Sequence, residues 1–328
     1  SIALVEKHRI GGTCLNVGCI PAKELLETAA VRRAIDSAAE FGLRTSPPEL
    51  DFSVTQARKQ GVVDGLIGGL TGLLKKRKVT VFDGVGSLHA DHVVRVSGGE
   101  SGEVELRGTS VILASGSVPR TIPGFEIDGA TIVTSDELLS LTELPETAVV
   151  IGGGAIGCEF ASMMSDLGTK VTILEALPQI LPGCDEDITR VVLRSFKGRD
   201  IDVRTGVAVK GHELQFTGGT TVLFGEGETI TVDMVVVSVG RRPCSDDLGL
   251  DGTAVQVSER GHVVVDDQCR TAEPGVWAVG DLIATPALAH IGFAEGMLAI
   301  RDLLGEDPTP IDYTKVPWCI YCHPEVSF

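Results

Sequence analysis

The chain has 328 residues and a formal net charge of −17 at pH 7. An acidic chain of this kind disfavours nucleic acid and anionic membranes as partners, because both bind basic surfaces. Its hydrophobic content of 43% supports sizeable folded cores and disfavours disorder. No apolar run approaches the roughly 20 residues of a membrane span, and we recognise no signal peptide. The length favours two or three domains.

The first predicted element is a β-strand, because residues 2–5 are mostly apolar and Glu6 follows them. The segment IALVEK matches VTILEA at residues 171–176, where an acid also ends an apolar run. If the later segment binds a dinucleotide, Glu6 is a second ribose-binding acid. The strand, glycine loop and helix of that first half-unit, roughly 30 residues, would then precede Ser1, so we expect a fragment of a longer protein.

A cysteine pair, Cys14 and Cys19, follows in the stretch GGTCLNVGCIPAKELL. In an ideal α-helix, Cα atoms five positions apart are roughly 8.6 Å from each other, whereas a disulfide needs them within about 7 Å. A disulfide therefore requires an irregular turn, for which Gly18 and Pro21 are suited. The helix expected after the pair favours a thiolate at its N-terminus. These features favour a redox-active pair.

Two other interpretations of the pair stay open. A zinc site needs four ligands, and no second pair or histidine motif has suitable spacing. Cys319 and Cys322 do form a C-x-x-C motif, but on an expected strand. A purely structural disulfide over so short a loop would stabilise little. The eight cysteines of so long a chain fit a reducing cytoplasm better than a secreted disulfide scaffold.

The next predicted elements are two helices and a small sheet. Pro21 suits the first turn of a helix that Gly42 ends. Residues 52–77 have a helical pattern, although five glycines weaken it. From Val79 to Leu113 apolar residues alternate with period two, which predicts a small antiparallel sheet. The segment TSVILASGSVP then predicts a buried strand and a glycine turn.

The middle of the chain has the clearest nucleotide-binding pattern, TAVVIGGGAIGCEFASMMSDLGTKVTILEA. An apolar strand precedes Gly152, Gly154 and Gly157, a helix follows them, and a second apolar strand ends in Glu175. Together these features make a strong G-x-G-x-x-G motif, in which a pyrophosphate approaches the helix N-terminus. Glu175 would accept a bond from a ribose hydroxyl and repel a 2′-phosphate, which favours NAD over NADP. The alternative is an empty doubly wound domain whose glycines serve packing only.

The last third of the chain is predicted to contain further strands and a helix. DMVVVSVGRRP predicts a buried strand. GVWAVGDL places Asp281 directly after a strand end, where an acid can hold a hydroxylated ligand. A helix is expected after LAH, and VPWCIYCHPEVSF is expected to form a strand at the end of the chain.

The segments GGTCLNVGCIPAK, GGGAIGCE with Glu175, VGRRP, WAVGD and LAH together resemble the FAD-dependent pyridine nucleotide–disulfide oxidoreductases. The resemblance covers essentially the whole chain. It implies an α/β fold with two Rossmann-like, three-layer domains, the first incomplete at its N-terminus. It also implies FAD and NAD as cofactors. Within the family, LAH and YCHPEV are most similar to the enzymes that oxidise dihydrolipoamide, while mercuric and glutathione-type reductases are alternatives.

The resemblance implies catalytic roles for four residues. Cys14 would be the thiol that exchanges with the substrate, and Cys19 the thiolate against the flavin. Lys23 would lie near the flavin N5 atom and pair with Glu159. The residues themselves also favour a partner for Glu159, because an acid flanking an apolar stripe is costly unless paired. Lys23 as a solvated lysine and His290 as a packing residue are the alternatives that the residues leave open.

The resemblance also implies two sets of cofactor-binding residues. The expected FAD residues are Glu6, Gly12, Thr13, Lys23, Gly86, Ser115, Gly116, Gly280, Asp281, Leu288, Ala289 and His290. The expected NAD residues are Gly152, Gly154, Ile156, Gly157, Glu175, Val207 and Gly240. We expect no metal site.

The implied domains are a truncated first part of an FAD domain (1–118), an NAD domain (119–243), a second part of the FAD/central domain (244–312) and the start of a dimerisation domain (313–328). The expected partners are a protein-bound lipoyl group, the core of a 2-oxoacid dehydrogenase complex and a second copy of the parent protein.

The family's acid–base His–Glu pair lies in the dimerisation domain, and His323-Pro324-Glu325 is expected to be structural rather than that pair. We therefore expect residues 1–328 alone to have little activity toward lipoamide. A non-catalytic nucleotide-binding module is the alternative of a different class.

Overall fold

The computed structural model describes residues 1–100, 102–216 and 218–328. These residues form two separately packed units, and each is described by itself. The first unit contains residues 1–16, 65–118 and 241–316, and the second unit contains residues 17–64, 119–240 and 317–328. The helix α3 (Phe52–Lys76) begins in the second unit and ends in the first.

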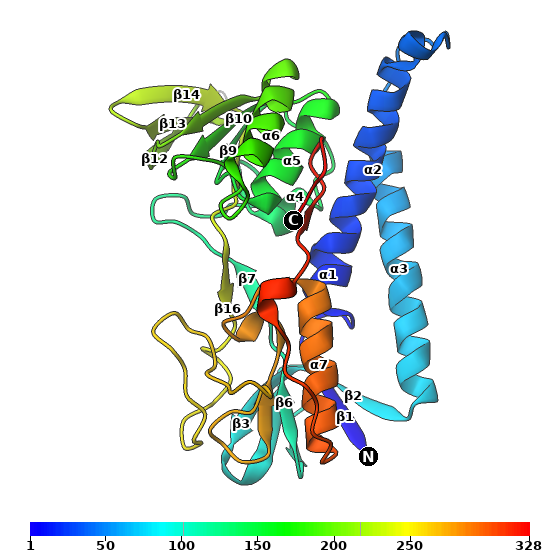
Figure 1. Cartoon of the computed structure of the whole chain (residues 1–328), viewed down its shortest axis with the longest axis vertical. Helices are drawn as coiled ribbons and strands as arrows, with labels where there is room; N and C mark the ends of the chain where they lie inside the picture. The colour runs from blue at the N-terminus through cyan, green and yellow to red at the C-terminus, as the bar shows by residue number, and fades with distance from the viewer. Residues whose placement is uncertain (101, 217) are drawn as a thin grey trace. The chain divides into compact units, whose positions relative to one another are not determined.

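A parallel sheet lies at the centre of the second unit, and Figure 1 shows its strands β9 and β10 beside α5 and α6. Its strand order is β11–β10–β9–β15–β8. Its strands are β8 (Ile132–Val133), β9 (Thr147–Ile151), β10 (Lys170–Glu175), β11 (Asp202–Thr205) and β15 (Met234–Val237). Most residues of β9, β10 and β15 are buried, as expected for strands that are covered on both faces. The predicted strand–loop–helix–strand order of residues 147–175 is confirmed.

Helices and a second sheet surround this parallel sheet. The helices are α2 (Cys19–Asp36), α4 (Ser135–Leu138), α5 (Ala155–Asp166) and α6 (Glu186–Gly198), with the short helix η1 (Ala38–Phe41) after α2. Leu25 and Ala29 of α2 share a buried core with Met163 of α5. An antiparallel sheet is formed by β12 (Val209–Leu214), β13 (Thr220–Phe224) and β14 (Glu228–Val232). The parallel sheet of the second unit therefore lies between two hydrophobic cores, one that includes residues of α2 and one that includes residues of β13.

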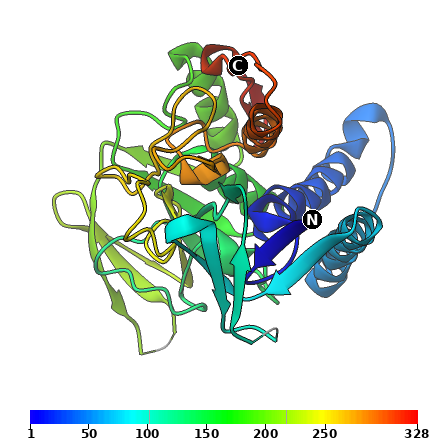
Figure 2. The ribbon, with the colours of Figure 1, turned by 90° about the horizontal axis from the view of Figure 1, so that it is seen from below.

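The first unit combines parallel strand pairs with a small antiparallel sheet. The parallel pairs are β1 (Ile2–Glu6) with β2 (Val79–Asp83), seen side by side from below in Figure 2, and β6 (Val111–Leu113) with β17 (Val276–Ala278). The antiparallel sheet contains β3 (Val85–His89), β4 (Val93–Ser97) and β5 (Val104–Arg107). The remaining elements are β7 (Ser117–Pro119), β16 (Arg241–Pro243), η2 (Ala90–His92), η3 (Gly280–Leu282), α7 (Ala289–Leu303) and η4 (Tyr313–Lys315).

The prediction of one antiparallel sheet over residues 79–113 is wrong at both ends. β2 pairs with β1, and β6 pairs with β17, both in parallel register. Among the described residues of this stretch, the antiparallel pairs are those of Val85–His89 with Val93–Ser97 and of Val93–Ser97 with Val104–Arg107. Period-two alternation indicates a strand with one solvated face, but it carries no information about the direction of the neighbouring strand.

The predicted helix over residues 52–77 is confirmed in spite of its glycines. Each glycine inside a helix costs about 1 kcal/mol relative to alanine. The burial of Phe52 and Val63 in this helix offsets part of that cost.

The single strand predicted at the end of the chain is instead a hairpin. β18 (Cys319–Ile320) pairs antiparallel with β19 (Val326–Ser327), and the turn between them contains a cis His323–Pro324 bond. Proline cannot donate a backbone hydrogen bond, so it interrupts the pattern that suggested one strand.

Two further observations concern the chain as a whole. Residues 17–64, which the predicted domain division includes in the FAD segment 1–118, pack in the second unit. The functional role assigned to each segment stays a prediction. Within the described ranges, no helix is both long and apolar enough to cross a membrane.

Candidate functional site

The cysteine pair lies at a break between two helices. α1 (Gly12–Val17) contains Cys14, and α2 starts at Cys19. Gly18 separates the helices with φ −144° and ψ −119°, a backbone conformation outside the helical region. Cys14 and Cys19 form a disulfide, so the irregular turn predicted from the spacing is confirmed. A disulfide leaves neither sulfur as a thiolate ligand, and this argues against the zinc alternative.

Lys23 of α2 and Glu159 of α5 form an ion pair. The Lys23 Nζ atom donates to both carboxylate oxygens of Glu159, at 3.1 and 3.0 Å. Glu159 is only 8% exposed, and the backbone N–H of Tyr321 donates to its Oε1 atom at 2.9 Å. The predicted partner of the buried Glu159 carboxylate is therefore present, and Lys23 is not a freely solvated lysine.

The glycine motif forms the tight turn between β9 and α5. Gly152 has a φ of +106°, which favours glycine. A Cβ atom on Gly157 would lie 2.0 Å from the Gly152 carbonyl oxygen, so only glycine allows the helix this close to the strand. The N-terminus of α5 begins here, at Ala155 and Ile156. This arrangement can hold a pyrophosphate by backbone N–H groups and the helix dipole.

Glu175 lies at the end of β10, next to this glycine turn. Its carboxylate accepts hydrogen bonds from the backbone N–H groups of Gly153 and Leu177, both at 2.6 Å. Its own carbonyl oxygen accepts from the N–H of Val207 at 3.0 Å. Gly240, the last expected NAD residue, has a φ of +102°. All seven expected NAD residues therefore belong to the second unit.

The expected FAD residues, apart from Lys23, all belong to the first unit. Asp281 follows β17 within η3 and accepts a hydrogen bond from the Ser117 hydroxyl at 2.6 Å. Arg241 donates through Nε to the Ser117 hydroxyl at 2.7 Å and through Nη2 to the Ser117 carbonyl at 2.8 Å. Its Nε atom also lies 3.8 Å from the Asp281 carboxylate. Ser117 and Arg241 thus fix the orientation of Asp281.

The other expected FAD residues lie at turns and element ends. The Glu6 carboxylate at the end of β1 accepts from the His8 N–H at 2.9 Å. Gly12, Gly116 and Gly280 have positive φ angles. Thr13 is in α1, Gly86 is in β3, the Ser115 hydroxyl bonds the Cys244 carbonyl, and Leu288, Ala289 and His290 form the start of α7.

A buried acid, Glu295 of α7, was missed by prediction. It is fully buried and accepts from the Gly280 N–H at 2.6 Å and the Tyr313 hydroxyl at 3.0 Å. Burial raises the pKa of its carboxyl above the ordinary value of 4.5. Its signal in the sequence is an acid inside the apolar pattern LAHIGFAEGMLAI, which is costly unless hydrogen-bonded. Ser117 and Arg241 were also missed, because only the fold brings them to Asp281.

The residues of the second unit fit a dinucleotide, and those of the first unit place acids where a second one would bind. The glycine turn leaves no space for a Cβ atom at Gly157, and Glu175 stands at the neighbouring strand end. In the first unit, Glu6 and Asp281 follow the carboxyl ends of the parallel strands β1 and β17. Ligands of α/β proteins bind outside such strand ends. Among the described residues, no cluster of three or more His, Cys, Asp or Glu could hold a metal ion.

Comparisons with known proteins agree with this geometry. The family model described as pyridine nucleotide-disulphide oxidoreductase matches residues 1–296. The dihydrolipoyl dehydrogenase of Bacillus subtilis (strain 168) is 39% identical over an alignment 338 residues long, gaps included. The alignment covers 99% of this chain and 71% of that protein. Dihydrolipoyl dehydrogenase 2 of Haloarcula marismortui is 38% identical and matches over 99% of this chain and 69% of that protein.

Solved structures show the same fold. LpdA from Mycobacterium tuberculosis superposes with a TM-score of 0.93 at 24% identity, over 100% of this chain and 72% of that one. The HOCl-induced flavoprotein disulfide reductase RclA from Escherichia coli superposes with a TM-score of 0.87 at 30% identity, over 99% and 71%. The α/β fold with Rossmann-like nucleotide-binding architecture is therefore confirmed. With its family match and its disulfide, the chain belongs to the pyridine nucleotide-disulphide oxidoreductases, enzymes that use FAD and NAD.

Proposed function

We propose that this chain carries the redox centre of an NAD-dependent dihydrolipoamide dehydrogenase. The observation that carries the proposal is the Cys14–Cys19 disulfide at the start of α2, the helix whose Lys23 forms an ion pair with Glu159 of α5. The dihydrolipoyl dehydrogenases at 36–39% identity support the choice of substrate. Glu175 supports NAD over NADP, because a carboxylate repels a 2′-phosphate.

The proposed reaction exchanges one disulfide for another. A thiolate of dihydrolipoamide attacks Cys14, the Cys14–Cys19 bond breaks, and the second substrate thiolate displaces Cys14 to close lipoamide. The cysteine pair has then gained two electrons. The two protons of the substrate thiols are transferred to the pair or released to water. FAD, when bound, supplies the two-electron chemistry that links the thiols to NAD. With the cofactors bound, reoxidation of the pair would pass two electrons and one proton to NAD as hydride and release the second proton to water.

The chain's own residues have positioning and electrostatic roles in this proposal. Cys14 would be the exchanging thiol, and Cys19 would be the thiolate that passes electrons to bound FAD. The Lys23 ammonium lies on the same face of α2 as Cys19, four positions away, where a cation favours the thiolate. Glu159 holds that ammonium, and Asp281 holds the ribityl or phosphate region of FAD. Glu6 and Glu175 take the two adenosine riboses.

The proposal extends to partners. The substrate is a lipoyl group attached to a protein of a 2-oxoacid dehydrogenase complex, and the protein acts as a homodimer. The functional division into FAD, NAD, central and dimerisation segments belongs to the same proposal.

A spectroscopic experiment tests the proposal without depending on turnover. The chain is reconstituted with FAD and reduced anaerobically with one equivalent of dihydrolipoamide. Long-wavelength absorbance should develop as the Cys19 thiolate forms beside the flavin. Cys14→Ser should show this absorbance before any reductant is added, because its Cys19 has no disulfide partner. Cys19→Ser should never show it.

Equal spectra for the two serine variants would contradict the assigned roles. Absence of the band in the FAD-bound wild type would favour a non-catalytic nucleotide-binding module. Reoxidation of the NADH-reduced chain by lipoamide, glutathione disulfide and Hg(II) in turn separates the proposed substrate from those of other disulfide reductases.

A further inference from the structure

The hairpin β18–β19 places Tyr321 against the Lys23–Glu159 ion pair. The Lys23 Nζ atom lies 4.5 Å from the centre of the Tyr321 ring, within the range of a cation–π interaction. The backbone N–H of Tyr321 donates to Glu159 at 2.9 Å. One residue therefore contacts both members of the pair, through the ring for the cation and through the backbone for the anion.

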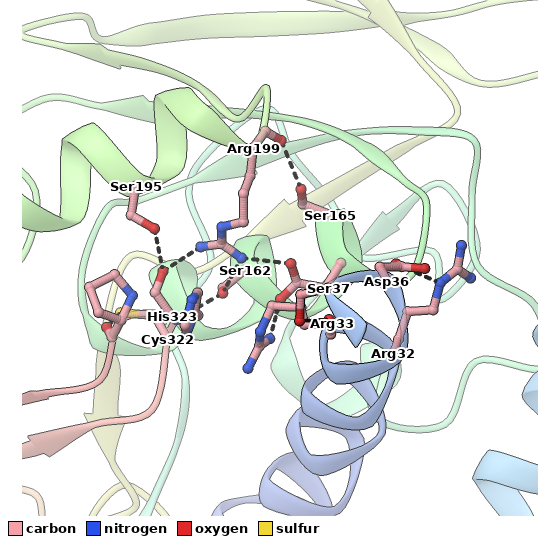
Figure 3. Close-up of polar contacts among 12 residues, drawn as sticks. Arg32, Arg33, Asp36, Ser37, Ser162, Ser165, Ser195, Arg199, Cys322 and His323 are labelled. Carbon is pink, nitrogen blue, oxygen red and sulfur yellow. Dashed lines mark hydrogen bonds and ion pairs between the residues drawn. The ribbon is translucent and has the colours of Figure 1, made fainter. Parts of the chain in front are cut away.

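The hairpin turn is anchored on α5 and at the end of α6 (Figure 3). The backbone N–H of His323 donates to the Ser162 hydroxyl at 3.0 Å. The His323 carbonyl accepts from the Ser195 hydroxyl at 3.2 Å and from the Arg199 guanidinium. Ile320 and Cys322 are buried on either side of Tyr321. These contacts fix the backbone of the hairpin turn at several points.

The anchor and the ion pair lie on the same face of α5. Glu159, Ser162 and Asp166 are spaced by three and four positions, which places them along one side of the helix. Asp166 accepts from Arg199 at 2.8 Å and pairs with Arg33 of α2. Two contact regions therefore join α2, α5 and the hairpin, one at Lys23–Glu159–Tyr321 and one at Arg33–Asp166–Arg199.

Lys23 needs such support because its side chain is 34% exposed. Ion pairs with this much solvent access are weak, since water competes with the carboxylate. A cation–π contact at a partly exposed site contributes on the same scale as the ion pair itself. Without the ring, the lysine side chain would gain access to other rotamers that point its ammonium to water.

We propose that Tyr321 is a positioning residue that holds the Lys23 ammonium on Glu159, and that the β18–β19 hairpin exists in this place to present it. The proposal rests on the proposed function for its catalytic meaning, because Lys23 then acts on the Cys19 thiolate. The contact itself lies wholly within the second unit and can be measured without cofactor.

The first measurement is the rate at which Lys23 is acylated in the native chain, followed by mass spectrometry. Exposed Lys170 and Lys210 of the same chain serve as internal standards. Tyr321→Leu should make Lys23 roughly two- to fivefold more reactive, the factor that a cation–π contact of this exposure implies. Tyr321→Phe keeps the ring and should match the wild type. Ser162→Ala removes one anchor of the hairpin and should raise the rate by a smaller factor.

The second measurement uses the FAD-bound Cys14→Ser chain, whose long-wavelength absorbance reports the Cys19 thiolate. Adding Tyr321→Leu should raise the pH midpoint of that absorbance by roughly 0.3 to 0.7 units, because a less localised cation stabilises the thiolate less. Adding Tyr321→Phe should leave the midpoint unchanged.

The two measurements separate the two hypotheses. If Tyr321→Leu leaves the Lys23 acylation rate at the wild-type value, or Tyr321→Phe raises it as much, the positioning role is refuted. If acylation rises as expected but the FAD-bound chain shows no thiolate absorbance, the positioning role stands and the proposed function fails. A midpoint that does not move, with acylation raised, refutes the step from Lys23 to Cys19.

Discussion

Burial divides the free cysteines of the described chain into two classes. Cys319 is exposed and Cys244 is partly exposed, whereas Cys158, Cys184, Cys269 and Cys322 are buried. Burial, followed by the charge of Glu159, raises the pKa of Cys322 to about 12. Burial, followed by Glu295, raises the pKa of Cys269 to about 12. A thiol in this state reacts slowly, because the thiolate is the nucleophile.

Alkylation of the native oxidised chain near pH 8 should therefore modify Cys319 first. Cys269 and Cys322 should react at least on the order of a hundredfold more slowly, since each unit of pKa removes a factor of ten in thiolate. Peptide mass spectrometry gives the rate at each site. Mild reduction should add Cys14 and Cys19 to the reactive set, and unfolding in urea should equalise all sites. Equal native rates for Cys319 and Cys322 would contradict the buried position of Cys322.

At the scale of elements, β9, the glycine turn and α5 pack closely against one another. The close approach of α5 to β9 depends on Gly157, whose Cβ would overlap the Gly152 carbonyl. Gly154 provides a matched control in the same turn, because a Cβ there meets nothing within 4 Å.

Gly157→Ala should lower the free energy of unfolding by about 3 kcal/mol, the upper range for overpacking, and weaken NADH binding strongly. Gly154→Ala should cost about 1 kcal/mol or less, the loss of a good N-cap residue. Urea unfolding and fluorescence titration with NADH measure the two effects. Equal effects of the two variants would show that the close approach is not limiting.

One buried carboxylate, that of Asp166, links α2, α5 and the end of α6. The Asp166 side chain is only 4% exposed and pairs with both Arg33 and Arg199. Asp36 of the same helix α2 pairs with Arg32 (Figure 3). The two atoms lie 2.9 Å apart, but the Asp36 side chain is 49% exposed.

Asp166→Asn should lower the free energy of unfolding by about 3 kcal/mol, because two partly buried guanidiniums lose their counter-charge. Asp36→Asn should cost under about 1 kcal/mol, the usual value of an exposed pair. Urea unfolding of both variants provides the comparison. A cost for Asp166→Asn no larger than that for Asp36→Asn would mean that solvent reaches the cluster freely.

At the scale of the whole molecule, titratable groups make stability depend on pH. Partial burial, and after it Arg33 and Arg199, lower the pKa of His323 from its ordinary value of 6.5. The unfolded chain then binds more protons than the folded chain as pH falls below that value. This contribution to stability is present above pH 6.5 and is lost as pH falls through the lower folded pKa. In the first unit, the hydrogen bond from Arg270 lowers the pKa of Asp302 below 3.8, so its contribution is lost only in stronger acid.

We therefore expect the free energy of unfolding to decline first below about pH 6.5, with the second unit affected before the first. His323→Asn should flatten the decline on the acid side of this value while leaving stability at higher pH nearly unchanged. The pH dependence of the free energy of unfolding is measured by urea unfolding at a series of pH values. The fluorescence of Trp318, which lies beside the hairpin, follows the unfolding. An unchanged slope in the variant would exclude His323 as the group responsible.

Much of the site follows from local sequence features. The glycine spacing before α5, the acids Glu6 and Glu175 after apolar strands, and the break at Gly18 between the cysteines depend on nearby residues alone. Turn chemistry and side-chain periodicity act over a few residues, so they are visible in the sequence.

Only the tertiary structure decided the contacts between distant segments. The parallel pairing of β2 and β6, the hold of Ser117 and Arg241 on Asp281, and the position of Tyr321 over Lys23 join residues from far along the chain. Such contacts form because the packing of whole elements brings those residues together, and no short-range periodicity encodes which strand or side chain will be the neighbour. The sequence by itself determined the redox and nucleotide motifs; the fold determined what holds them in place.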